Sequence, residues 1–142
     1  MAACSGDDSD GEADPDLSIT TTTIVFTGDA GSPFCTELRD LALQDVLAEP
    51  AQTPADLETG FTTLLGLLQR AADAAPEELR ADTALLVEGI SALDDALRAV
   101  GYSYDALAES PEGPTVAAAV NDPTFGVAGD RIEAYKRQVC KL

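Results

Sequence analysis

Residues 79–104 read LRADTALLVEGISALDDALRAVGYSY, and this stretch decides the fold. Its stripe of mainly apolar side chains recurs alternately four and three positions apart, the heptad spacing of a helix that packs lengthwise against other helices. The abundance of Ala and Leu in the rest of the chain also favours helix. We therefore predict an all-α fold with a central helix that opens at Pro76 and ends near Gly101. The stripe comprises Leu79, Thr83, Leu86, Ile90, Leu93, Leu97, Val100 and Tyr104.

Three further helices are predicted where a capping residue precedes a proline, because proline is favoured at the first position of a helix. Four helices joined by short connections favour an antiparallel up-down four-helix bundle, which we expect to occupy residues 32–142. Residues 105–121 contain two prolines and a glycine that break the pattern, and we expect this segment to be irregular. The three helices are expected over residues 33–48, 54–74 and 123–140.

The first 31 residues are expected to form a tether outside the bundle. Residues 5–16 carry six acidic side chains and almost no apolar ones, so this segment cannot bury enough surface to fold and should be disordered. Residues 17–26 are rich in β-branched side chains and should be extended. We expect the last three of them, Ile24 to Phe26, to dock on the helices; pairing of the segment with another strand is the open alternative.

The chain contains three cysteines: Cys4, Cys35 and Cys140. An up-down bundle brings the start of its first helix beside the end of its last, so Cys35 and Cys140 should lie at the same end. We predict a disulfide between them; two buried free thiols in a reducing compartment are the alternative. Cys4 follows small residues and precedes the acidic run, which resembles the end of a bacterial lipoprotein signal. The resemblance implies that Cys4 carries a lipid and that Met1 replaces a removed export signal; a native cytosolic start with an incidental cysteine is the alternative.

The chain as a whole resembles the secreted lipoproteins common in high-GC actinobacteria. The likeness rests on the three cysteines, the acidic tether, the Ala- and Leu-rich domain, and the closing sequence YKRQVC at residues 135–140. It implies an exported protein held at the outer face of the cell membrane by the lipid on Cys4. It implies no particular activity, because none is established for that family.

The composition excludes several functions. With 26 acidic and 8 basic residues the net charge is −18, which opposes binding to nucleic acids and to anionic lipid headgroups. The chain has no histidine, so Ser-His-Asp and Cys-His arrangements are impossible. Adjacent carboxylates such as Glu77 and Glu78 diverge by about 100° on a helix and do not converge on a substrate. We expect no catalytic residues, no metal site and no cofactor.

Four aromatic residues give the only site prediction. In the expected bundle, the starts of the second and fourth helices share one end with the close of the third, opposite the disulfide. Aromatic side chains there would line a site for a small apolar or amphipathic ligand, or would simply plug the bundle end. We expect a non-enzymatic binding module; the alternative is a structural subunit that contacts another envelope protein through an exposed apolar patch. The candidate residues are Phe61, Tyr102, Tyr104 and Phe125.

Overall fold

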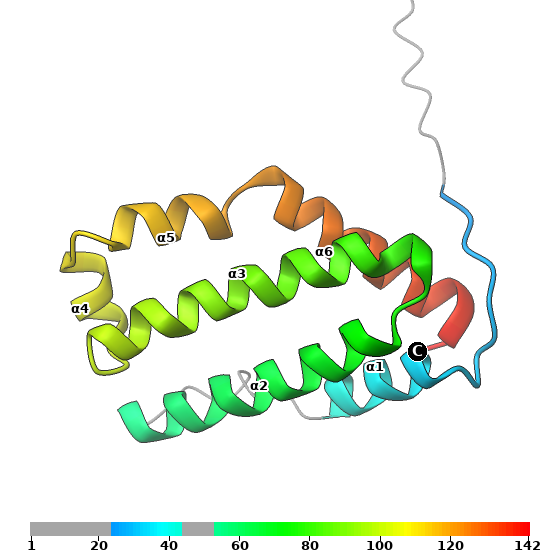
Figure 1. Cartoon of the computed structure of the whole chain (residues 1–142), viewed down its shortest axis with the longest axis horizontal. Coiled ribbons are helices and arrows are strands. Elements are labelled where there is room, and N and C mark those ends of the chain that lie inside the picture. The colour runs from blue at the N-terminus through cyan, green and yellow to red at the C-terminus, as the bar shows by residue number, and fades with distance from the viewer. Residues whose placement is uncertain (1–23, 44–52) are drawn as a thin grey trace, which may run out of the picture.

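A computed structural model describes residues 24–43 and 53–142, and within these ranges the protein is all-α (Figure 1). The described residues form six α-helices and no strand, which confirms the predicted fold class. Several predictions lie outside the described residues. They are the lipid site at Cys4, the disordered acidic run at 5–16, the extended residues 17–23 and the end of the first predicted helix at 44–48.

The three helix starts predicted from a capping residue and a proline are confirmed. The hydroxyl of Thr53 accepts a hydrogen bond from the backbone N–H of Asp56 at 3.2 Å, and the carboxylate of Asp122 accepts one from the N–H of Thr124 at 2.8 Å. Ser32 caps the remaining helix in the same way. These bonds satisfy N–H groups that have no partner in the first turn of a helix. The helices are α1 (Pro33–Leu43), α2 (Pro54–Ala74) and α6 (Pro123–Tyr135).

The central helix consists of a short 3₁₀ turn, η1 (Glu77–Leu79), followed by α3 (Arg80–Ala99). Leu79 and Leu97 of the apolar stripe are completely buried. The helix ends before Gly101 and Tyr102, whose φ angles of 70° and 58° are both left-handed. Glycine adopts this conformation freely and tyrosine rarely does. Contacts of the Tyr102 side chain must therefore stabilise the turn after α3.

Residues 105–121, predicted to be irregular, instead carry most of two short helices, α4 (Tyr104–Glu109) and α5 (Gly113–Val120). Both pack on α3, and helices this short are stabilised by packing more than by sequence period. The hydroxyl of Ser110 accepts a hydrogen bond from the N–H of Gly113 at 3.1 Å and so links the two helices. Pro114 looks like a helix breaker in the sequence, but it stands in the first turn of α5, where proline is tolerated.

The helices are arranged around an antiparallel hairpin formed by α2 and α3 (Figure 1). Helix α1 packs on α2, while α5 and α6 follow one another along α3. The guanidinium of Arg131, near the end of α6, binds Asp82 at the start of α3 at 2.8 Å, so these two helices are antiparallel. A π-helical turn, η2 (Lys136–Cys140), continues α6 and brings the C-terminus next to α1.

A disulfide joins Cys35 in the first turn of α1 to Cys140 in η2, as predicted. The two Cα atoms are 5.3 Å apart, a normal separation for a disulfide. Both cysteines are buried in the same core cluster, among side chains of α1, α2, α6 and η2. The disulfide therefore fixes one edge of the molecule, where its first and last described helical elements meet.

The residues before α1 dock on the helical domain through Phe26. The side chain of Gln138 accepts a hydrogen bond from the N–H of Phe26 at 2.8 Å and donates one to the carbonyl of Ile24 at 3.0 Å. Phe26 is buried, whereas Ile24 and Val25 are 42% and 76% exposed. Of the three residues expected to dock, only Phe26 enters the core.

Candidate functional site

The four aromatic residues predicted to form one site do not gather in one place. Phe61 and Tyr102 lie together in a buried cluster with leucines of α2, α3 and α4. Tyr104 is 54% exposed and stands at the edge of a shallow hollow between α3, α4 and α5. Phe125 packs against Gly89 in the middle of α3. Phe61 and Tyr102 act as core side chains, which agrees with a plug at this end of the molecule.

The displacement of Phe125 has a physical cause in the insertion of α5. In a simple four-helix bundle α6 would begin opposite the end of α3, near Leu97. Here α5 occupies that part of α3, and α6 begins opposite Gly89, about two helical turns earlier. Because glycine has no side chain, the ring of Phe125 can lie directly on the backbone of α3 at this point.

Three other aromatic residues gather at the disulfide end instead. The ring of Tyr135 lies edge-on to Phe26 and to Phe34, with centroid separations of 5.4 and 5.5 Å. The guanidinium of Arg131 lies 5.5 Å from the ring centroid of Phe26. All three rings are buried, so this cluster consolidates the core beneath the disulfide and offers no open surface.

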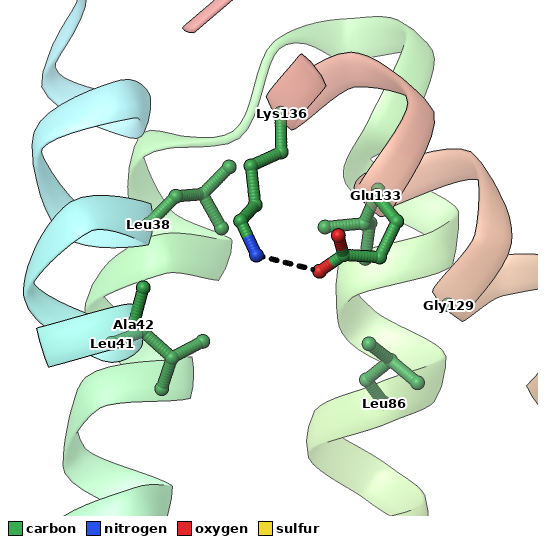
Figure 2. A pocket seen from close by; sticks show the side chains of 8 residues that line it. Leu38, Leu41, Ala42, Leu86, Gly129, Glu133 and Lys136 are labelled. Atoms are coloured by element: carbon green, nitrogen blue, oxygen red, sulfur yellow. Dashed lines mark hydrogen bonds and ion pairs between the residues drawn. The ribbon is translucent and has the colours of Figure 1, made fainter. Parts of the chain in front are cut away.

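An apolar groove with a volume of about 340 Å³ lies between α1 and α6. Figure 2 shows α1 on one side of it and α6 with η2 on the other, with α3 behind. Its walls are aliphatic except at one edge. The lining residues are Leu38, Leu41 and Ala42 from α1, Leu86 from α3, Gly129, Ile132 and Glu133 from α6, and Lys136 from η2.

A smaller and more enclosed pit of about 40 Å³ shares four of these side chains: Leu38, Leu41, Leu86 and Ile132. Leu68, Ala71 and Thr83 complete it from α2 and α3. The hydroxyl of Thr83 donates to backbone carbonyls of its own helix, at 3.0 Å to Leu79 and 3.1 Å to Arg80, so its polar group is already satisfied. The groove therefore continues inward as an apolar recess between all four principal helices.

The polar edge of the groove is an ion pair between Lys136 and Glu133. The ammonium of Lys136 donates to the carboxylate of Glu133 at 2.9 Å, and Figure 2 shows the pair at the mouth of the groove. Their side chains are 24% and 51% exposed, so the pair contributes little to stability. It gives the mouth donors and acceptors without a net charge.

The groove is open because α1 and α6 meet mainly through η2 and because Gly129 has no side chain. A Cβ atom added at Gly129 would meet no other atom within 4 Å, so a larger side chain would project into free space. A glycine inside a helix costs about 1 kcal/mol relative to alanine. Gly129 within a predicted helix was thus the sequence signal for this site, and reasoning from the aromatic residues alone missed it.

Among the described residues, the titratable side chains that line the groove are Lys136 and Glu133, which are paired with each other. These described residues form no arrangement suited to acid-base catalysis. Burial raises the pKa of Tyr102 and of Tyr135, so these phenols stay protonated at neutral pH, and neither lines the groove. Within residues 24–43 and 53–142 no three acidic or cysteine side chains lie close enough to hold a metal ion. None of the described helices is both long and apolar enough to cross a bilayer.

The chain was compared with known proteins at the levels of family, sequence and structure. No protein-family model, no curated protein and no solved structure matches it.

Proposed function

We propose that this protein is a non-enzymatic binding module whose groove between α1, α3 and α6 holds the apolar part of a small amphipathic molecule. The observation that carries the proposal is the groove itself, whose walls are aliphatic and whose polar groups are confined to the mouth. Its volume of about 340 Å³ falls in the range of roughly 300–1,000 Å³ that is usual for small-molecule sites.

The mouth of the groove favours an uncharged or zwitterionic head group. A ligand carboxylate would compete with Glu133 for the ammonium of Lys136, and a ligand cation would compete with Lys136 for Glu133. A head group with hydroxyls can hydrogen-bond to both partners and leave the ion pair intact. The overall charge of −18 further disfavours an anionic ligand.

We also propose that the module works at the cell envelope. The disulfide is consistent with an oxidising compartment, and the resemblance of residues 1–16 to a lipoprotein start supports a lipid on Cys4. In this view the protein belongs with the secreted actinobacterial lipoproteins, and the membrane is contacted only through that lipid. The fold is then an up-down four-helix bundle of α1, α2, α3 and α6, into which α4 and α5 are inserted.

A structural subunit that contacts another envelope protein is the second candidate. It is favoured by Val25 and Ile24, which are apolar yet 76% and 42% exposed beside the disulfide end. Exposed apolar side chains that adjoin one another can mark an interaction surface. A variant with serine at both positions should lose the partner and keep ligand binding if the two functions are separate.

The groove is tested by filling it. Gly129→Leu places an aliphatic side chain into free space and raises helix propensity, so the variant should fold at least as well as the wild type. Gly126→Leu is the matched control, because Gly126 is an exposed glycine of the same helix that does not line the groove. Native mass spectrometry with monooleoylglycerol should show a complex with wild type and with Gly126→Leu, but not with Gly129→Leu. No complex with wild type, or equal binding by Gly129→Leu, would refute the proposal.

A further inference from the structure

A second apolar hollow, of about 250 Å³, lies between α3, α4 and α5 at the end of the molecule away from the C-terminus (Figure 1). None of its lining residues is charged, although the chain as a whole carries 24% charged residues. The side chains that define it are Leu93 from α3, Tyr104 and Leu107 from α4, and Val116, Ala117 and Val120 from α5.

Exposed carboxylates follow or precede the residues of this uncharged surface. Asp105, Glu109 and Glu112 are each next in sequence to a lining residue, and all three are exposed. Within the part of the chain that the structure describes, none of the three forms an ion pair. From residue 88 to residue 122 the sequence has one basic residue, Arg98, which is held by Asp94 and Asp95 at 2.6 and 3.1 Å.

We propose that this hollow docks a cationic amphipathic helix of a partner protein. Lysines and arginines beside the apolar anchors of such a helix would meet the free carboxylates, so the charges are complementary. Because the same carboxylates repel an anionic bilayer, a protein segment is the occupant that fits. Other helix-binding grooves bind amphipathic helices in the same way, through apolar side chains spaced three or four residues apart.

The size of the hollow limits the contact to a short stretch of the partner. Helix α5 has eight residues and is therefore about 12 Å long, which matches about two turns of a docked helix. One or two large apolar side chains of the partner would fill the space. Tyr104, which is 54% exposed at the edge, offers an aromatic face and a hydroxyl of the kind that often anchors interfaces.

This docking surface is independent of the groove proposed to bind a small molecule. The two sites share no lining residue: the groove is lined from α1, α3, α6 and η2, and the hollow from α3, α4 and α5, with different residues of α3 in each. Failure of one proposal therefore leaves the other standing. Gly129→Leu, which fills the groove, should leave binding at the hollow unchanged.

The test uses a fluorescently labelled synthetic helix with leucines on one face and lysines on the other, and a counterpart with glutamate in place of each lysine. Anisotropy titration of the wild type should show binding of the lysine peptide that weakens as salt is added, and no binding of the glutamate peptide. Equal binding of both peptides, or no binding of the lysine peptide, would overturn the proposal.

Two sets of variants separate docking from a general attraction of charges. Ala117→Leu fills the hollow without changing any charge and should weaken binding by about tenfold or more. Ala118→Leu is the matched control, because Ala118 is the next exposed residue of α5 and does not line the hollow. Asp105→Asn combined with Glu109→Gln should weaken binding and flatten its salt dependence. Unchanged binding by Ala117→Leu would show that the peptide does not occupy the hollow.

Discussion

The hydroxyl of Tyr102 donates a hydrogen bond of 2.9 Å to the carboxylate of Asp94, two turns earlier in the chain. Asp94 is only 3% exposed, and its other oxygen accepts a hydrogen bond of 2.6 Å from Arg98. This pair explains why a tyrosine tolerates a left-handed backbone after α3: the hydrogen bond and the burial of the ring hold it there. The turn that leads into α4 depends on this contact.

Tyr102→Phe should therefore destabilise the protein although it removes a single oxygen atom. It deprives a buried carboxylate of one partner, and a hydrogen bond to a charged group contributes about 1.5–3 kcal/mol. Urea unfolding should report a loss of that size. Tyr104→Phe is the control, because Tyr104 is exposed and should change stability by less than about 0.5 kcal/mol. Equal effects of the two substitutions would contradict this account.

Removal of the disulfide should cost a large part of the stability. It links residues 105 positions apart, and disulfides that close long loops contribute about 2–5 kcal/mol. We expect Cys35→Ala with Cys140→Ala to lower the free energy of unfolding by that amount, measured by urea denaturation with Cys4→Ala in both proteins. A difference below about 1 kcal/mol would mean that packing alone joins α1 to η2.

Gly89→Ala should destabilise the protein, against the usual gain of about 1 kcal/mol for such a change inside a helix. The added Cβ would collide with the ring of Phe125, and overpacking of this kind costs about 1–3 kcal/mol. The same substitution in a Phe125→Ala background should be stabilising. Gly66→Ala, where the Cβ meets nothing within 4 Å, should be stabilising in the wild type as well. A stabilising Gly89→Ala in the wild type would show that α6 does not lie this close to α3.

Asp122 should contribute to the acid sensitivity of the fold. The hydrogen bonds from the hydroxyl and the N–H of Thr124 lower the pKa of Asp122 below its ordinary value of 3.8. The folded state therefore binds this proton less readily than the unfolded state, and the stability from Asp122 is lost as the pH falls below about 4. Asp122→Asn keeps the cap and should reduce the fall in unfolding free energy on acidification. An unchanged acid dependence would exclude this contribution.

The elements that could be predicted from the sequence are those determined by neighbouring residues, by a regular apolar spacing, or by the positions of the two cysteines. The starts of α1, α2 and α6 follow from Ser32-Pro33, Thr53-Pro54 and Asp122-Pro123, because a cap and a proline act on the backbone around them. The central stripe from Leu79 identified α3, and the positions of the two buried cysteines predicted their disulfide.

The candidate site could not be predicted because it depends on how far apart the helices stand. Helices α4 and α5 gain their stability from packing on α3. In the sequence of 105–121 the most visible residues are the prolines and the glycine, which usually interrupt helices. Their presence shifted Phe125 away from Phe61 and Tyr102 and removed the predicted cluster. The groove arises where α1 and α6 diverge beyond the contact between Phe34 and Tyr135. In the sequence it is marked by Gly129, which lines it.

The central claim is that an apolar chain lies in the groove between α1, α3 and α6, and methyl NMR tests it most directly. Protein labelled at the methyl groups of Leu, Ile and Val would be titrated with monooleoylglycerol. The account predicts shifts and nuclear Overhauser contacts to the acyl chain at Leu38, Leu41, Leu86 and Ile132, with none at Val116 or Leu107. Contacts confined to the hollow between α4 and α5, or none at all, would contradict it.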